Sequence, residues 1–531
     1  MGDSQTKVFV REATGLIRNL SFFDTISSNF AIINIASALT FPVLLIAVTF
    51  PHANIPLAIL ITIPPILAYN GLYSYFARAM PRSGGEYVYI SRILNPGIGF
   101  AANFSFAALN MFYVAYYGNS IGTIGLSALF YSLGLKQNNQ SLVNLGSTLA
   151  TPAAGFAIGT VAIVVFSALA IWGVRKVFTV QNIMVVIGVI GTIAMITVIA
   201  AADHTAFVST FNQYGSYDKF VNASSSAGFT PSQSTSWSDT ILATGLVALT
   251  LLFGQYSIYV GGEVKQSNRN LPPSIFATTF ITAGFMIGAI LVANAAFGST
   301  FIGASQALFN AGDSAYPFAI YPYYNFLASL LTNNAFLISL MGLGYALWTA
   351  AGLSFNIIAN SRCTLAWSFD RVFPDMFAKV SDRFHTPANA IILTAVFSEL
   401  LLVLYSFELG YVSFFFGTTL AYVLAFAFTA ISGIVFPFRK SKRHLYEGSG
   451  ADRKVAGIPV ITVLGIATLA YFIVLSYGLF TNAAFNANSP TGLLAIASFW
   501  IIGLAIFVCF YFYRKRKGIR VSLAYADIPP E

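Results

Sequence analysis

Two apolar segments of the chain contain polar and small residues that could bind a small charged molecule. Residues 240–261 contain Gly254 after Phe253, and Gln255, Tyr256 and Ser257 follow. Residues 21–47 contain hydroxyl and amide side chains in apolar surroundings, namely Ser27, Ser28, Asn29, Asn34, Ser37 and Thr40. Glycine lets a helix unwind, and an unwound turn exposes backbone N–H and C=O groups that can bind a carboxylate, an ammonium group or an ion.

The same residues have a simpler explanation as well. Small and hydroxyl side chains permit tight helix packing in membranes, and glycine is common in membrane helices. Counted along the chain, however, these are the first and the sixth apolar segments, so they begin two sets of five. Interrupted helices at matching positions of an inverted repeat are typical of a binding site near the middle of the membrane, and this match favours the binding interpretation.

Motifs for other chemistry do not occur. The sequence contains no GxxxxGK[ST] loop for ATP phosphates, no HExxH and no paired CxxC. The four histidines are scattered. We therefore expect neither an enzyme nor an ATP-driven pump, and no metal or cofactor. A channel or a membrane receptor is the alternative from another class, but neither a continuous polar pore lining nor a sizeable soluble domain is evident.

Composition shows which elements must position the two segments. The chain has 531 residues, of which 57% are hydrophobic and only 8% are charged, against about 25% charged in soluble proteins. Residues 93–135 and 455–513 contain no charged side chain. Because crossing the hydrocarbon takes about 20 apolar residues and uninterrupted apolar runs are helical, the sequence predicts an all-α polytopic membrane protein.

Apolar runs between polar breaks predict about twelve transmembrane helices. They cover residues 21–47, 54–77, 98–131, 153–172, 179–201, 240–261, 274–297, 335–361, 388–405, 410–436, 458–480 and 491–513. This gives a tail (1–20), a first repeat (21–201), an outer loop (202–239), a second repeat (240–436), a basic loop (437–457), two further helices (458–513) and a second tail (514–531). The polar start reads as a tail rather than a signal peptide.

Positive charges predict the orientation. Of the 27 Lys and Arg residues, only Lys136 and Lys219 lie outside the tails and the loops that follow even-numbered spans. Because Lys and Arg accumulate on the cytoplasmic side, both ends are expected to be cytoplasmic in a multi-pass protein of the cell membrane. The net charge of +9 then favours contact with the lipid bilayer and not with nucleic acid. No disulfide is expected between Cys363 and Cys509.

Four short motifs carry a family resemblance. They are PRSGGEYVY at 81–89 with NPGIGF at 95–100, EVKQSNRNLP at 263–272, Ser361-Arg362 followed by SFDRVFP at 368–374, and PAN at 387–389. In this order they resemble segments of amino acid permeases in the amino acid, polyamine and organocation (APC) superfamily, and the resemblance covers residues 20 to about 440.

The resemblance implies a 5+5 inverted repeat with discontinuous helices 1 and 6, two C-terminal helices, and transport of amino acids by alternating access. Carried over by position, the substrate carboxylate would lie at Ile35, Ala36, Ser37 and Ala38. The amine and side chain would contact Leu252, Phe253, Gly254, Gln255, Tyr256 and Ser257. The family usually has glycines in the helix-one segment, where Ala36 and Ala38 stand.

Gate and coupling residues are further expectations. Aromatic gate candidates are Tyr113 and Tyr116 of the third span and Trp348 of the eighth, together with Phe253. Protons and sodium ions are the candidate coupling ions. Some relatives place a lysine in helix five, but the matching position here is near Gly188. The coupling candidates are Thr349, Ser354 and Glu399, although helix-eight hydroxyls more commonly bond their own helix and Glu399 could instead reach water at the outer interface.

Three other carboxylates are expected to have structural roles. Asp24 is expected to cap the first helix or contact a cytoplasmic gate, and Glu86 and Glu263 are expected to face cytoplasmic cations. With no Lys or Arg and no well-placed carboxylate near the binding segments, a neutral or hydrophobic amino acid is mildly favoured, by symport or exchange. A polyamine or another organic amine is the alternative substrate. The oligomeric state is not predicted.

Overall fold

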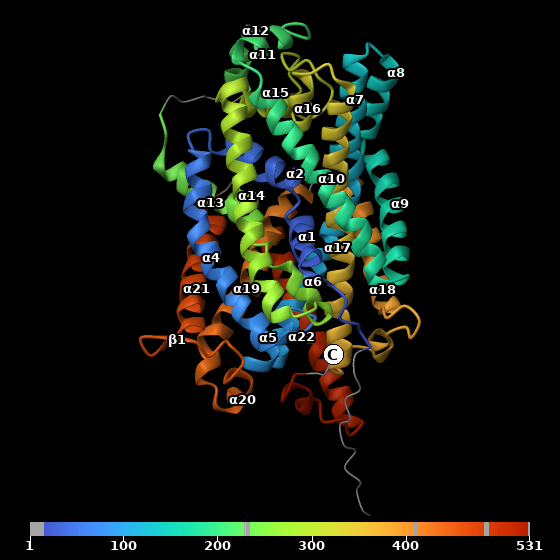
Figure 1. Cartoon of the computed structure of the whole chain (residues 1–531), viewed down its shortest axis with the longest axis vertical. Helices are drawn as coiled ribbons and strands as arrows, with labels where there is room; N and C mark the ends of the chain where they lie inside the picture. Colours follow the sequence, from blue (N-terminus) through green and yellow to red (C-terminus); the bar gives the residue numbers. More distant parts are fainter. Residues whose placement is uncertain (1–14, 228, 230–233, 408–410, 483–487, 529–531) are drawn as a thin grey trace, which may run out of the picture.

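The protein forms an elongated bundle of helices that run side by side (Figure 1). The computed structural model describes residues 15–227, 229, 234–407, 411–482 and 488–528. Parts of the predicted tails, of the outer loop and of the start of the tenth span therefore lie outside the described residues. Within them, eleven helices are long and apolar enough to cross a membrane. The predicted all-α polytopic class is confirmed. The first predicted span, residues 21–47, is not among the eleven because it is divided into shorter helices.

The first half of the chain forms the helices of the first predicted repeat and of the outer loop. They are α1 (Phe22–Ile33), α2 (Ile35–Ala38), the π-helical η1 (Leu39–Leu44), α3 (Leu45–Thr49), α4 (Ile55–Ala79), α5 (Glu86–Ile93), α6 (Pro96–Ser120), the π-helical η2 (Ile121–Leu126), α7 (Ser127–Lys136), α8 (Gln140–Leu149), α9 (Pro152–Ile171), α10 (Val174–Ala200), α11 (His204–Phe211) and α12 (Tyr217–Ser226). Several start at side-chain caps, such as Asn95, which accepts from the Gly97 amide at the start of α6.

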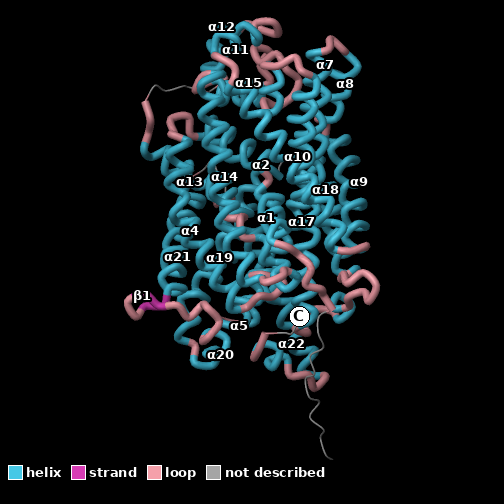
Figure 2. Tube along the Cα trace, in the orientation of Figure 1, coloured by secondary structure: helices cyan, strands magenta, loops and turns pink. Residues whose placement is uncertain are grey.

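The second half repeats the pattern and adds the last two spans. Its elements are α13 (Trp237–Leu251), the 3₁₀ helix η3 (Tyr256–Glu263), α14 (Ser267–Phe297), α15 (Phe301–Ala311), α16 (Tyr324–Leu330), α17 (Ala335–Phe369), η4 (Asp375–Ala378), α18 (Ala388–Phe407), α19 (Tyr411–Val435), η5 (Phe436–Phe438), η6 (Lys440–Lys442), α20 (Arg443–Tyr446), β1 (Lys454–Val455), β2 (Ile458–Pro459), α21 (Val460–Thr481), α22 (Pro490–Arg516) and η8 (Val521–Tyr525). The short strands β1 and β2 pair antiparallel, and nearly all of the rest is helix or loop (Figure 2).

Three spans of the first predicted repeat pack against the equivalent spans of the second predicted repeat. The second span, α4, packs on the seventh, α14; the third, α6, packs on the eighth, α17; and the fourth, α9, packs on the ninth, α18. Pairing of equivalent helices across two sets is the arrangement that an inverted repeat produces. The last spans cover one side, with α21 on α4 and α19, and α22 on α6 and α19.

The two ends of the bundle differ in charge and covering. One end, here named the basic end, carries α5, α20 and the C-terminal segment (Figure 1) and the loops with most of the Lys and Arg residues. The other end is covered by α11, α12, α15 and α16 (Figure 1). Lys136 and Lys219 belong to α7 and α12 at this second end, and the Lys136 Nζ is held by the Leu330 carbonyl at 2.7 Å.

Candidate functional site

The first span is interrupted at Asn34. Helix α1 stops at Ile33, Asn34 adopts φ +51°, and α2 begins at the next residue. Asparagine tolerates this left-handed conformation better than most residues, and its Oδ1 accepts from the Ser37 amide at 3.2 Å. The amides of Ile35 and Ala36 have no hydrogen-bond partner among the described residues, and the buried Asn34 Nδ2 has none either. The predicted residues 35–38 thus follow directly on a break with unpaired donors.

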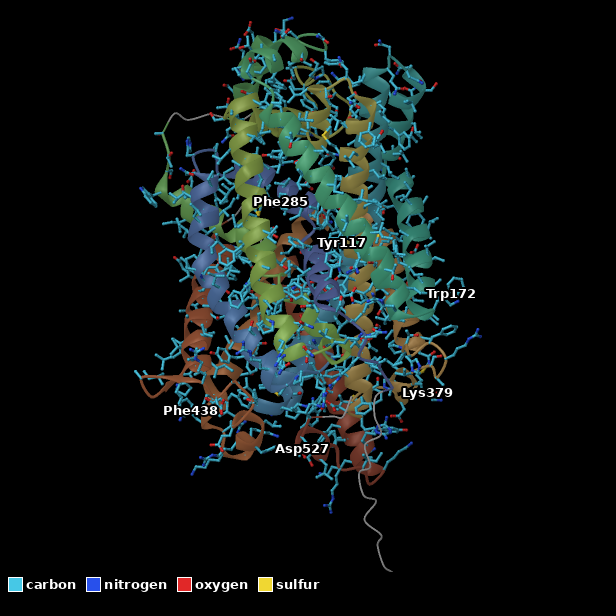
Figure 3. The ribbon with its side chains drawn as sticks, viewed as in Figure 1. Tyr117, Trp172, Phe285, Lys379, Phe438 and Asp527 are labelled. Carbon is cyan, nitrogen blue, oxygen red and sulfur yellow. The ribbon has the colours of Figure 1, made fainter. Side chains whose placement is uncertain are left out.

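Two tyrosines of α6 approach this break. The Tyr117 hydroxyl donates to the Ile32 carbonyl at 2.8 Å, and the Tyr116 hydroxyl lies 3.4 Å from the Ser37 Oγ. Tyr117 lies about halfway along the bundle (Figure 3). Since a break in a helix leaves carbonyls without their usual partners, Tyr117 satisfies a group that the interruption has freed.

Replacing Tyr117 with phenylalanine should therefore weaken the interrupted segment without disturbing the bundle. The buried Ile32 carbonyl would lose its donor, which costs about 1–3 kcal/mol. We expect a lower melting temperature of the purified protein. Tyr345→Phe is the matched control, because the buried Tyr345 hydroxyl has no partner among the described residues. Equal effects of the two substitutions would contradict this role of Tyr117.

The sixth span is interrupted over residues 252–255. Helix α13 ends at Leu251 and η3 starts at Tyr256. The next two amide bonds after Leu252 are long, with the Phe253 amide 3.3 Å from the Thr250 carbonyl and the Gly254 amide 3.4 Å from the Leu251 carbonyl. A Cβ on Gly254 would lie 3.3 Å from the Thr279 Oγ1 of α14. The glycine therefore lets the interrupted chain lie close against the neighbouring helix.

The two interruptions are joined by one side chain. The Asn29 Oδ1 of α1 accepts from the Ser257 amide at 2.8 Å, so a residue of the first span caps the start of η3. The Oγ of Ser257 and the Oε1 of Gln255 are buried without a partner among the described residues. Sequence reasoning noted Asn29 as a polar residue but did not predict this capping contact.

Aromatic rings surround Phe253 beside the second interruption. The centroid of its ring lies 6.1 Å from that of Tyr113, 5.5 Å from Tyr256 and 5.3 Å from Tyr422. The hydroxyls of Tyr256 and Tyr422 both donate to the Asn110 Oδ1, at 3.0 and 3.1 Å. Sequence reasoning missed Asn110 and Tyr422, although a polar residue in an uncharged span was a usable signal. Phe253 and Tyr113, two of the predicted gate residues, are brought together.

Other predicted residues lie elsewhere. Trp348 packs on α10, where its Nε1 donates to the Thr192 Oγ1 at 3.1 Å and its ring fills the space beside Gly188. A lysine at that position would have no room. Thr349 donates to the carbonyl of Ala346 in its own helix at 2.7 Å.

The remaining coupling candidates contact neighbouring helices. Ser354 bonds its own helix at the Ala351 carbonyl and also donates to the Gln181 Oε1 of α10 at 3.3 Å. The Glu399 carboxylate accepts from the hydroxyl of Thr160 of α9. Among the residues searched, no group of three or more His, Cys, Asp or Glu side chains could hold a metal ion.

Buried contacts close the basic end. Glu263 accepts from the Arg362 Nε and Nη2 at 2.8 and 3.0 Å, and its carbonyl accepts from the Asn19 and Leu20 amides at 3.0 Å each. These bonds tie the chain before α1 to the end of η3 and to α17. The expectation that Glu263 faces a cation is confirmed, and the pair is fully buried.

The expectation for Glu86 was wrong. Its carboxylate accepts from the hydroxyl of Tyr259 and from the Asn103 Nδ2 at 2.7 Å, and it forms no ion pair with the described residues. The nearby Arg92 instead binds Asp370 of the α17–η4 segment at 2.6 Å. Sequence proximity to a cation did not predict this pairing, because the partner is 278 residues away.

Asp24 has the predicted capping role. It forms a capping box with Ser21 at the start of α1, and it also accepts from Arg175 and Asn182 of α10 at 2.7 Å each. The first helix is thereby fixed to the fifth span near the basic end.

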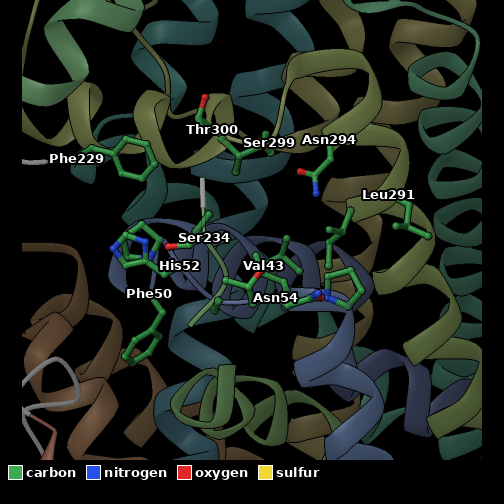
Figure 4. Close-up of a pocket in the computed structure, with 18 of the residues that line it drawn as sticks. Val43, Phe50, His52, Asn54, Phe229, Ser234, Leu291, Asn294, Ser299 and Thr300 are labelled. Carbon is green, nitrogen blue, oxygen red and sulfur yellow. The ribbon is translucent and has the colours of Figure 1, made fainter. Parts of the chain in front are cut away.

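A separate cavity of about 840 Å³ lies at the opposite end (Figure 4). Its lining includes Val43 and Ala47 of the first span, His52 and Asn54 before α4, and Asn294 of α14. None of residues 252–257 lines it. The sequence did not predict this cavity, and it touches the proposed site only through the outer part of the first span.

Comparison with known proteins gives one family. A search of curated proteins finds no match. A family model described as amino acid permease matches residues 20–489, which includes both interrupted spans and all four motifs. With 470 of 531 residues matched, this integral membrane protein of many apolar helices belongs to the amino acid permease family of the APC superfamily, a family of transporters of amino acids and related organic compounds.

Proposed function

We propose that this protein is a secondary active transporter that carries amino acids by alternating access, in symport or exchange. The observation that supports it best is the junction of the two interrupted spans. There Asn29 caps Ser257, and the Ile35 and Ala36 amides have no partner among the residues that the structure describes. Unpaired amides could bind the carboxylate of an amino acid, while residues 252–257 would contact its amine and side chain.

Neutral or hydrophobic amino acids fit this junction best. Its polar side chains are amides and hydroxyls, and the Phe253 ring contacts the rings of Tyr113 and Tyr256. At the basic end, Arg92 is paired with Asp370 and Arg362 with Glu263, so these charges neutralise one another. A neutral zwitterion needs no additional counter-charge, which favours it over a cationic amino acid.

An organic amine such as a polyamine is the second candidate. Four aromatic rings, Phe253, Tyr113, Tyr256 and Tyr422, lie within ring contact, and faces of such rings attract cations. Residues 35–38 and 252–257 contain no Asp or Glu, which weighs against a polyamine because it carries several positive charges.

The basic end would face the cytoplasm. It carries most of the Lys and Arg residues, and these accumulate on the cytoplasmic side of membranes. Both tails would then be cytoplasmic in the cell membrane, and Glu263 with Arg362 would form an inner gate.

Uptake by proteoliposomes tests the function. Vesicles containing the purified protein should accumulate or exchange part of a mixed pool of radiolabelled amino acids, saturably and more strongly for apolar members. Parallel vesicles should be given labelled putrescine, and imposed proton or sodium gradients would identify the coupling ion. Uptake of putrescine alone would favour the amine alternative, and absence of any uptake or exchange would refute the proposal.

A further inference from the structure

One buried carboxylate, that of Glu86, has no counter-ion among the residues that the structure describes. Glu86 begins α5 at the basic end, and its side chain is fully buried. Tyr259 of η3 donates to one carboxylate oxygen and Asn103 of α6 donates to the other at 2.7 Å. None of the described residues forms an ion pair with it. A buried carboxylate that is neither paired nor bound to a metal is costly in its charged form, so it favours binding a proton.

Neighbouring elements bring no charge to this carboxyl group. The titratable side chains that face it are tyrosines and one cysteine: Tyr69 and Tyr73 of α4, Tyr89 of α5, Tyr256 and Tyr259 of η3, and Cys363 of α17. Each is neutral in its ordinary form, and so they leave the carboxylate charge uncompensated. Burial raises the pKa of Glu86 to about 7, although the hydrogen bonds from Tyr259 and Asn103 lower it.

Two glycines before Glu86 allow the chain to lie close against Tyr259. Gly84 and Gly85 have φ of +104° and +58°, a region that other residues rarely adopt. A Cβ on Gly85 would come within 2.5 Å of the Tyr259 ring, and the Gly84 amide donates to the Tyr259 carbonyl at 3.2 Å. The turn therefore holds the second half of the interrupted sixth span against Glu86.

The carboxyl group also lies where the basic end must open. Tyr259 belongs to η3, which follows the interruption at 252–255. Asn103 belongs to α6 and in turn accepts from the Trp367 Nε1 of α17 at 2.7 Å. Movement of η3 away from α6 and α17, which opening of this end requires, would remove Tyr259 and admit water to Glu86.

We propose that Glu86 is the binding site of the proton that couples to transport. This rests on the proposed function. The proton is held on the carboxyl group while the basic end is closed, and it passes to water when η3 moves away and the carboxylate becomes hydrated. Proton release to the cytoplasm and opening to the cytoplasm are then the same event.

The sign of the pH dependence follows from hydration. A hydrated glutamate titrates near its ordinary pKa of 4.5, whereas burial in the closed arrangement raises the pKa to about 7. The closed arrangement therefore binds the proton more tightly. The bound proton therefore stabilises the closed arrangement over the open one. This stabilisation is complete below about pH 4.5 and is lost as the pH rises through about 7.

Native cysteines allow a test that needs no substrate. Cys363 is buried beside Glu86 and Cys509 is exposed. In a Cys509→Ser background, a polar maleimide should alkylate Cys363 only when the basic end opens. We expect the ratio of labelling rates, Glu86 protein over Glu86→Gln protein, to rise roughly seventyfold between about pH 5 and pH 8, the change that pKa values of 4.5 and about 7 give. Taking the ratio removes the pH dependence of the thiol itself. A ratio that stays constant with pH would overturn the proposal.

Uptake supplies the second readout. Glu86→Gln should abolish accumulation of the mixed amino-acid pool driven by an inward proton gradient, while exchange of the same pool across equal pH continues. Glu86→Asp, which keeps a titratable group, should retain gradient-driven accumulation and thereby exclude misfolding as the cause. Glu447→Gln is the matched control, because Glu447 lies at the same end of the bundle in an exposed ion pair with Arg443. Accumulation by Glu86→Gln equal to that of the parent would also overturn the proton site.

Failure of the proposed function can be distinguished from failure of the proton site. If the parent protein takes up no amino acid, the proposed function fails, and the labelling ratio still decides whether Glu86 binds a proton on closure. If the parent transports amino acids and the labelling ratio is flat, only the proton site fails.

Discussion

Replacing Gly254 with leucine is expected to abolish amino-acid uptake. Even a Cβ at this position would lie 3.3 Å from the Thr279 Oγ1 and 3.8 Å from the Ile275 carbonyl. The larger side chain must therefore push residues 252–255 away from α14, which misplaces both the unwound turn and Ser257. Because a shift of about 1 Å at a binding site can cost roughly a hundredfold in rate, we expect uptake to fall by at least that factor.

Gly254→Ala is the matched control for this substitution. Its single methyl group needs an adjustment of only a few tenths of an ångström, so most of the uptake should remain. Equal yields of folded protein on size-exclusion chromatography would separate the binding defect from misfolding. Unchanged substrate affinity in a well-folded Gly254→Leu protein would contradict the placement of the site at this interruption.

The second large effect is expected at the buried ion pair of the basic end. Arg362→Met would leave the Glu263 carboxylate buried without the two hydrogen bonds at 2.8 and 3.0 Å. Removing one partner of a buried pair typically costs about 3–5 kcal/mol, because the remaining charge is uncompensated. We expect a marked fall in the melting temperature of the detergent-purified protein.

Two further variants serve as controls for this measurement. The double substitution Glu263→Met with Arg362→Met removes both charges and should recover most of the stability, since apolar replacements of buried pairs are often neutral. Arg443→Met breaks the exposed pair with Glu447 and should change stability by less than about 1 kcal/mol. A single Arg362→Met protein as stable as the Arg443→Met protein would contradict a structural role for the pair.

Much of the architecture could be predicted from apolar patterning alone. Long uncharged runs specify membrane helices because backbone groups must be satisfied within the segment, and the positions of Lys136 and Lys219 fit the predicted loops. Gly254 also marked the break in the sixth span, since glycine within an apolar run weakens a helix. The break in the first span was harder to place, because the left-handed conformation of Asn34 is one that asparagine adopts only in some contexts.

The contacts within the site depended on residues far apart in the chain. Tyr422 and Asn110 are separated by 312 residues, and Asn29 and Ser257 by 228. Hydropathy gives no register between such segments. For the same reason, Glu86 was expected to face a cytoplasmic cation, whereas the nearby Arg92 binds Asp370, 278 residues away.

A structure of the protein with a bound amino acid would test the central claim most directly. The ligand should be the member of the labelled pool with the greatest uptake. We predict its carboxylate within about 3 Å of the Ile35 and Ala36 amide nitrogens and its amine beside residues 252–257. Ligand density confined to the cavity beside His52 and Asn54, with both interruptions empty, would contradict the account.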